Sequence, residues 1–384
     1  MYDYQLTTLP NGVRIASERM PGVRSAALGI WVTTGSREEK ASESGAAHFI
    51  EHMLFKGTPT CSAGELAKRM DAIGGQINAF TTKELTCFHG RCLDTHLREA
   101  LSILCDMFFD SAFAEADVES ERGVILEEIG MYADDPSDLV SEKLSAAVFH
   151  GTPLGRPILG RKATLDKMTG AWLKEYKQSH YTADRIIITL AGSFTDEILD
   201  EIRARFSVMT PGKAKKLKHV TAQDSIVVKK KATEQNHLLA AFPAITDRDP
   251  RKYQMQLLSS ILGGGMSSRL FQQVREKNGL CYTVYSYGTS YEDVGLFSIY
   301  TALGRAQEPK AIACIRNVLT EFLQNGPTAE ELDLVREQSK ANVLMGLEST
   351  TARMSHLARG FGAVLFIWPV GKLGFGKGRQ SYLL

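Results

Sequence analysis

The chain carries almost no excess charge of either sign. Its 45 lysine and arginine residues nearly balance 44 aspartate and glutamate residues, which leaves a formal net charge of +1. Proteins that bind nucleic acid or anionic membranes through their overall electric field carry a clear positive excess. We therefore expect neither nucleic acid nor a membrane surface among the partners of this chain.

Long hydrophobic runs are absent as well. A membrane-spanning helix needs about 18 or more apolar residues in a row, and the most apolar run near the end of the chain is only AVLFIWPV. The first residues, MYDYQLTTLPNGVRIASERM, look like neither a secretory signal nor a transit peptide. These absences predict a cytoplasmic protein.

Cysteine is scarce and irregularly spaced. The 6 cysteines form no C-x-x-C pair and no disulfide framework, so we expect them to be reduced and mostly buried. Cys87, His89 and Cys92 are close in sequence, but on a strand Cys92 would face away from the other two. We therefore do not expect a metal site there.

Two hydrophobic periodicities alternate along the chain and predict its fold. With 384 residues, 43% of them apolar, the chain can form two domains of ordinary size. Strands are expected over YQLTTLPNGVRIASERM, RSAALGIWVTTG, INAFTTKELTCFHGRCL, RIIITLAGS, HLLAAFPAI, CYTVYSYGTSY and GLFSIYTAL. Amphipathic helices are expected between them, and each half begins with a strand. We predict an α+β fold of two similar domains, each a largely antiparallel sheet with helices on one face.

A polar segment separates the two halves. Residues 209–224, MTPGKAKKLKHVTAQD, contain proline, glycine and several lysines with few apolar residues, which is typical of a linker. No aromatic residues interleave with the lysines, so we interpret them as solvated rather than as a binding patch. This interpretation places an N-terminal domain at residues 1–208 and a C-terminal domain at residues 225–384.

The short stretch HFIEH carries the clearest chemical signal. On a helix, His48 and His52 lie about 40° apart on one face, and two imidazoles so placed can bind one tetrahedral ion. Glu51 flanks the pair, as the glutamate of H-E-x-x-H does from the other side. A catalytic zinc site needs a third protein ligand. Spacing alone leaves two candidates in ESERGVILEEIGMY, Glu127 and Glu128.

Six motifs, in order, resemble the insulinase/pitrilysin-type inverzincin metallopeptidases. They are HFIEHMLFKGT, GGQINAFTTKELTCF, ESERGVILEEI, PLGRPILG, LGGGMSSRLF and VREKNGLCYTVYS. The resemblance is to the short two-domain members, which include the β subunit of the mitochondrial processing peptidase and bacterial relatives. It extends from about residue 3 to about residue 357, and it implies a zinc metalloendopeptidase that hydrolyses extended or presequence-like peptides.

The resemblance also implies roles for individual residues of the first domain. It implies that Zn²⁺ is held by His48, His52 and Glu128, which lies 76 residues past His52. It implies that Glu51 is the catalytic base. Glu121 corresponds to an additional acidic residue of the family, which steadies a histidine ligand or helps catalysis.

Substrate contacts are implied for both domains. The motif Asn78, Ala79 and Phe80 corresponds to an edge strand to which the substrate adds as a further strand. Arg275 and Tyr282 correspond to residues of the second domain that hold substrate carbonyl groups and the oxyanion. Without the resemblance, these two would be an ordinary surface arginine and a half-buried tyrosine.

The resemblance to the family does not extend to the last residues of the sequence. From residue 358 the sequence ARGFGAVLFIWPVGKLGFGKGRQSYLL is glycine-rich and follows neither periodicity, which leaves the completeness of the second domain open. A rival interpretation is therefore a non-catalytic subunit that binds peptides or scaffolds a processing-peptidase-like complex. Such subunits usually lose parts of H-x-x-E-H, and this chain keeps all three residues. The resemblance further implies a homodimer or a heterodimer with a related subunit.

Overall fold

The chain forms two compact units, which do not follow the order of the sequence. The computed structural model describes residues 3–212 and 218–362. Unit 1 comprises the described parts of residues 1–130, 156–218 and 346–378, and unit 2 comprises residues 131–155 and 219–345. The expected domains 1–208 and 225–384, with a linker at 209–224, stay a prediction. The compact units differ from them because residues 131–155 and 346–362 each fold with the other half of the chain.

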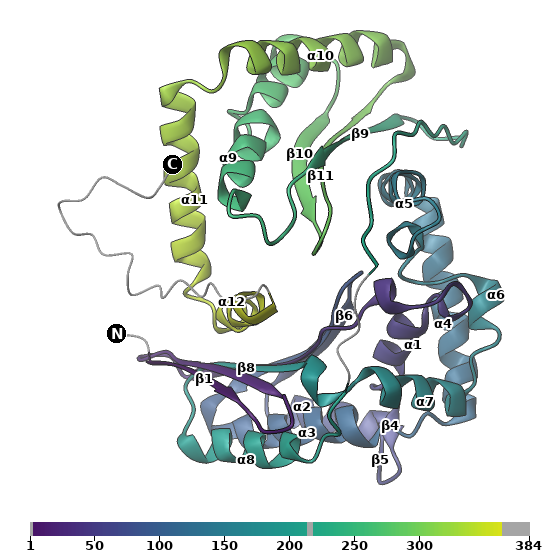
Figure 1. Ribbon diagram of the computed structural model, residues 1–384, viewed down its shortest axis with the longest axis vertical. Coiled ribbons are helices and arrows are strands. Elements are labelled where there is room, and N and C mark those ends of the chain that lie inside the picture. The colour runs from purple at the N-terminus through teal and green to yellow at the C-terminus, as the bar shows by residue number, and fades with distance from the viewer. Residues whose placement is uncertain (1–2, 213–217, 363–384) are drawn as a thin grey trace. The chain divides into compact units, whose positions relative to one another are not determined.

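Unit 1 is built on a six-stranded sheet in the order β1-β2-β8-β3-β7-β6 (Figure 1). Only β2 and β8 run parallel; the other neighbours are antiparallel. Residues Asn11 and Gly12 make the expected hairpin turn, with Gly12 at a φ of +101°. The strands are β1 (Asp3–Thr8), β2 (Arg14–Arg19), β3 (Ser25–Val32), β6 (Gln76–Thr81), β7 (Thr86–Leu93) and β8 (Ile186–Gly192), with a small ribbon of β4 (Gly57–Thr58) and β5 (Cys61–Ser62).

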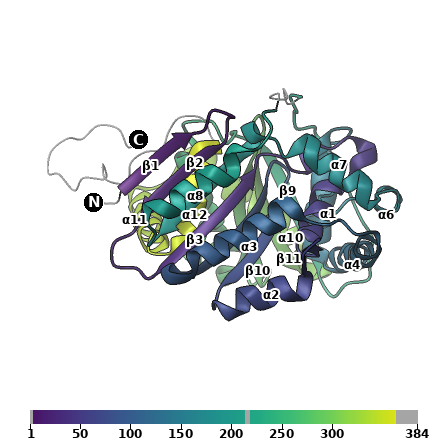
Figure 2. The ribbon, with the colours of Figure 1, turned by 90° about the horizontal axis from the view of Figure 1, so that it is seen from below.

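One face of this sheet packs against most of the helices of unit 1. Leu28 and Ile30 of β3 and Phe88 of β7 point to this face and are buried with apolar side chains of the helices. Figure 2 shows α3 and α8 lying over this face of the sheet. The helices of this layer are α1 (Ala46–Met53), α2 (Ala63–Ala72), α3 (Leu97–Asp110), α4 (Glu115–Asp134), α6 (Lys162–Leu165), α7 (Gly170–His180) and α8 (Asp196–Ser207).

The opposite face is covered by a helix from the end of the chain. Helix α12 (Thr350–Gly362) packs Met354 and Leu357 against the small and aromatic residues of that face, including Trp31 (Figure 1). Arg353 of α12 also forms a buried ion pair with Glu18 of β2. Residues 358–362 of the glycine-rich end thus continue a helix. Residues 363–384, on which the completeness of the second domain depends, lie outside the described residues.

Unit 2 has a three-stranded antiparallel sheet in the order β10-β11-β9. Phe297 and Ile299 of β11 face a core formed with α9 and α10, whereas Leu296 faces the other side, where it packs with Val148 of α5. The elements are α5 (Pro136–Val148), β9 (Asn236–Ala244), α9 (Lys252–Gly263), the π-helical segment η6 (Phe271–Lys277), β10 (Thr283–Ser290), β11 (Gly295–Leu303), α10 (Glu308–Asn325) and α11 (Ala329–Gly346).

The predicted fold class is confirmed: the chain is α+β, and both units are largely antiparallel sheets packed with helices. The expectation of helices on one face only was wrong, because α12 also packs on the second face of the sheet in unit 1 and α5 on that of the sheet in unit 2. Within the described residues, no helix is both long enough and apolar enough to cross a membrane.

Candidate metal centre

Helix α1 presents His48, Glu51 and His52 beside a buried apolar stripe. Phe49, Ile50 and Met53 on this helix have no exposed surface, so packing fixes the rotation of the helix about its axis. The two histidines and Glu51 lie outside that stripe and are half-buried. The i, i+4 spacing in HFIEH therefore places His48 and His52 on one face of a helix, as the sequence predicted.

The first turn of α1 is held by a buried carboxylate. The backbone N–H groups of Gly45 and Ala47 donate hydrogen bonds to the two carboxylate oxygens of Glu39, each at 2.9 Å. Glu39 is itself buried, and burial raises its pKa to about 8 although the hydrogen bonds from Ala47 and Gly45 act in the opposite direction. Gly45 has a φ of +101°, a conformation that favours glycine. Glu39 thus anchors the helix directly before His48.

Helix α4 supplies the acidic side of the site. Glu121 and Glu128 are two helical turns apart and share a face with the buried residues Val118 and Ile125. Glu127 is exposed. The structure therefore brings Glu128 to the histidines and leaves Glu127 in solvent, a choice that spacing alone could not make.

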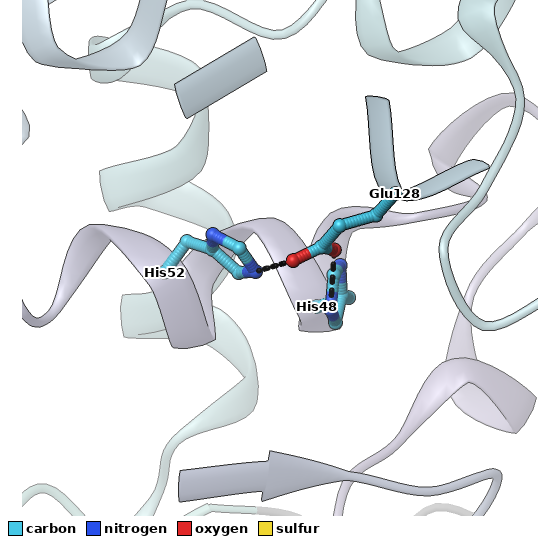
Figure 3. Close-up of side chains that lie close together, drawn as sticks. All are labelled: His48, His52 and Glu128. Carbon is cyan, nitrogen blue, oxygen red and sulfur yellow. Dashed lines mark ion pairs between the residues drawn. The ribbon is translucent and has the colours of Figure 1, made fainter. Parts of the chain in front are cut away.

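The side chains of three residues converge between α1 and α4 (Figure 3). The distance from His48 Nε2 to Glu128 Oε2 is 3.6 Å, and the distance from His52 Nε2 to Glu128 Oε1 is also 3.6 Å. Ligands of a tetrahedral zinc ion, each about 2.0–2.1 Å from the metal, lie about 3.4 Å from one another. One ligand atom from each of His48, His52 and Glu128 lies within 4.8 Å of the other two, so the three residues can hold a zinc ion, and among the described residues no other group of three could hold a metal.

The orientation of His52 is set by Glu121. His52 Nδ1 lies 2.9 Å from Glu121 Oε2, and Lys56 pairs with the other oxygen of the same carboxylate. Burial pushes the pKa of Glu121 up, but the hydrogen bonds from Lys56 and His52 outweigh it, and the pKa lies below its ordinary value. A carboxylate accepts the proton of Nδ1, so the lone pair of Nε2 is left for a metal.

Burial also sets the protonation of His48 and Glu51. It lowers the pKa of His48 to about 3, with the neighbouring His52 as the second cause, so His48 is neutral at pH 7 as a metal ligand must be. Burial raises the pKa of Glu51, and the nearby Glu128 adds to the rise. A hydrogen bond from Thr81 and the proximity of His52 act in the opposite direction. A raised carboxyl pKa suits a general base that works near neutral pH.

The predicted substrate strand lies at the edge of the sheet of unit 1. Strand β6, which contains Asn78, Ala79 and Phe80, pairs with β7 and is last in the strand order. Asn78 Oδ1 accepts a hydrogen bond from the N–H of Ala79 at 2.8 Å. Phe80 is 39% exposed and packs edge-on against Trp31. An edge strand can accept a further strand; the substrate role of the three residues stays a prediction.

Arg275 and Tyr282 contact each other in unit 2. The guanidinium of Arg275 lies 4.4 Å from the centre of the Tyr282 ring and 4.7 Å from that of Phe271. Its Nη1 donates a hydrogen bond to the backbone carbonyl of Tyr282 at 2.8 Å. Tyr282 is 73% exposed, so its ring and hydroxyl are accessible. Their role in binding substrate stays a prediction.

Two family descriptions together match most of the chain. Residues 14–162 match Insulinase (Peptidase family M16), and residues 167–339 match the Peptidase M16 inactive domain. The chain therefore belongs to the M16 metallopeptidase family, as its six motifs predicted.

Relatives and solved structures agree with this assignment. The chain is 44% identical to the uncharacterized zinc protease YmxG of Bacillus subtilis over 91% of this chain and 85% of that protein. It is 38% identical to the uncharacterized zinc protease SCO5738 of Streptomyces coelicolor over 92% of this chain and 79% of that protein. A solved peptidase M16 inactive domain from Pseudomonas fluorescens has the same fold, with a TM-score of 0.87 at 23% identity, over 94% of this chain and 88% of that one.

The predicted cofactor, Zn²⁺, agrees with the names of both relatives and with the three converging ligand atoms. Sequence reasoning missed three residues that support the site: Glu39, Lys56 and Thr81. Of these, Thr81 had a usable signal, since it continues the period-two pattern of Ile77 and Ala79 on β6. Cys87 and Cys92 belong to apolar clusters on opposite faces of the sheet.

Proposed function

We propose that this protein is a zinc-dependent endopeptidase that hydrolyses extended or unfolded peptides. The observation that carries the proposal is the convergence of His48, His52 and Glu128 with a half-buried Glu51 one residue before His52. Three protein ligands leave one position of a tetrahedral zinc ion free, which is the arrangement of catalytic rather than structural sites.

The residues around the free coordination position have different roles in hydrolysis. His48, His52 and Glu128 would hold the zinc ion, which would supply Lewis-acid chemistry: polarisation of a carbonyl group and a lower pKa of water. Glu51 accepts the proton of the attacking water and later gives a proton to the leaving amine. Glu121 keeps His52 in the tautomer that points Nε2 toward the metal.

The proposed substrate is an extended chain that pairs with the free edge of β6. Backbone hydrogen bonds to Asn78, Ala79 and Phe80 would hold it with little dependence on its sequence. Arg275 would bind a substrate carbonyl, and the exposed hydroxyl of Tyr282 would donate to the oxyanion. The contact of Arg275 with the Tyr282 ring supports a joint role, because it presents the two groups together.

The decisive test is the substitution Glu51→Gln in the full chain. We expect the variant to retain one equivalent of zinc and to lose about 10²- to 10⁴-fold in kcat on an unstructured peptide, because the amide cannot accept the proton. Glu127→Gln is the matched control, since this exposed glutamate is close in sequence to Glu128 and should leave both quantities unchanged. The proposal is wrong if Glu51→Gln cleaves as fast as the unaltered protein or if chelation leaves cleavage intact.

The rival function, a non-catalytic peptide-binding or scaffold subunit, predicts peptide binding without turnover in the zinc-loaded protein. The same assay separates the two functions. A homodimer or a heterodimer with a related subunit, and a cytoplasmic location, stay predictions that sedimentation and cell fractionation would test.

A further inference from the structure

A threonine on the edge strand contacts the proposed catalytic base. Thr81, the last residue of β6, places its hydroxyl oxygen 2.5 Å from Glu51 Oε2. Among the described residues, no other hydrogen bond to this carboxylate is found. A hydroxyl that donates to a carboxylate at this distance forms one of the stronger hydrogen bonds in proteins.

The surroundings of Thr81 decide the direction in which it donates. Its oxygen lies 3.4 Å from the hydroxyl oxygen of Thr86, the residue opposite it on β7. Thr86 is fully buried, and its own hydroxyl donates to the backbone carbonyl of Thr34 at 3.1 Å. The proton of Thr86 is therefore committed, which leaves the proton of Thr81 for Glu51.

Thr81 is well suited to hold a carboxylate in one place. Its β-branched side chain has few side-chain rotamers, and its backbone is paired with Thr86 in the sheet. With Oε2 held by Thr81, the other oxygen of Glu51 is left to meet a water molecule. A base fixed in this way needs no rearrangement when the reaction begins.

We propose that Thr81 is the positioning residue of the catalytic base: it orients Glu51 from the strand that accepts the peptide. This inference rests on the proposed function, and it deepens it. The base on α1 is then joined to the substrate strand by a direct hydrogen bond, so a peptide paired with β6 has a defined register relative to Glu51.

The kinetic test compares Thr81→Val, which keeps the shape but removes the hydroxyl, with Thr81→Ser, which keeps the hydroxyl. For Thr81→Val we expect roughly a 10- to 100-fold loss of kcat with an unchanged KM and a full equivalent of zinc. Thr81→Ser should recover kcat to within about threefold of the unaltered protein, because it can still donate. The proposal is overturned if Thr81→Val keeps its kcat, or if Thr81→Ser is as impaired as Thr81→Val.

A matched control separates positioning from loss of stability. Thr189 on β8 of the same sheet is buried, and its hydroxyl oxygen lies 2.7 Å from Trp31 Nε1, away from the metal ligands. Thr189→Val also removes one buried hydrogen bond, but it should leave kcat unchanged. An equal loss of kcat in Thr189→Val would assign the effect of Thr81→Val to stability and overturn the proposal.

A second measurement does not depend on peptidase activity. In a double-mutant cycle with Thr81→Val and Glu51→Ala, the shifts in Tm should be non-additive because the two side chains interact directly. Additive shifts would contradict the hydrogen bond itself. If the unaltered protein neither binds zinc nor cleaves peptides while the cycle remains non-additive, the proposed function fails and the contact of Thr81 with Glu51 stands.

Discussion

At the residue scale, the metal centre depends on which atoms of each side chain are already engaged. His52 uses Nδ1 for Glu121 and presents Nε2 to Glu128, while burial keeps His48 neutral at pH 7. Glu128 faces both imidazoles, and Glu127, one position earlier, points into solvent. Glu127 and Glu128 are therefore chemically identical, but only Glu128 lies beside the histidines, and substitution of each can test this difference.

Glu128→Gln should remove the anionic member of the three ligands and weaken zinc binding by at least about 100-fold, because the loss of a residue that only supports a ligand already costs 10- to 100-fold. Glu127→Gln should bind zinc as the unaltered protein does. Zinc bound per chain after dialysis against a weak chelator measures the difference. Equal zinc retention in the two variants would rule out Glu128 as the ligand.

At the element scale, charged and hydroxyl side chains cap the ends of helices, and their spacing in the sequence indicates such caps. Helix α11 follows Thr328 in the stretch Thr-Ala-Glu-Glu, a capping-box pattern. The N–H of Thr328 donates to Glu331 Oε2 at 2.7 Å, and the N–H of Glu331 donates to Thr328 Oγ1 at 3.1 Å. Arg269 adds two further hydrogen bonds to the Glu331 carboxylate, at 2.6 and 2.8 Å. The capping box was readable from spacing, but Arg269, far away in sequence, was not.

Glu331 should make the stability of the protein depend on acid pH. The hydrogen bonds from Arg269 lower its pKa from the ordinary 4.5 to about 2. Because the folded-state pKa lies below the unfolded one, the stabilisation is complete above pH 4.5 and is lost as the pH falls toward 2. We expect Glu331→Gln to cost about 1–3 kcal/mol at pH 7 and nothing near pH 2, as measured by denaturant unfolding. Glu330→Gln, at an exposed neighbour, should show no such difference at either pH.

At the scale of the whole molecule, compact units and chain order do not coincide. Helix α12 follows the residues of unit 2 in sequence, yet Met354 and Leu357 complete the core of unit 1 beside Trp31. Residues 131–155 are the reverse case, since they precede the predicted linker but fold with unit 2. A division at residues 209–224 would therefore assign α12 to the second domain and residues 131–155 to the first, although each folds with the other unit.

Leu357→Ala tests the packing of α12 in unit 1. Leu357 is 2% exposed, and truncating a buried leucine costs about 2–5 kcal/mol. Unfolding followed by tryptophan fluorescence should report it, because Trp31 lies in the same cluster. Leu323→Ala on α10 is the control, since Leu323 is 85% exposed and should change stability by less than about 0.5 kcal/mol. Similar destabilisation by both substitutions would contradict the placement of α12.

The sequence by itself determined the α+β class and the arrangement of His48, Glu51 and His52. Residues three or four positions apart on a helix share a face whatever the rest of the chain does, so a local pattern is sufficient. The family motifs added Glu128 and Glu121 by their order along the chain.

Tertiary structure alone decided the contacts between distant residues. The donation of Thr81 to Glu51, the pairing of Lys56 with Glu121 and the packing of α12 on the far face of the sheet all belong to this group. Each of these contacts depends on how two elements pack against each other. The hydrophobic periodicity within one element predicts which face is buried, but not which residues of another element it contacts.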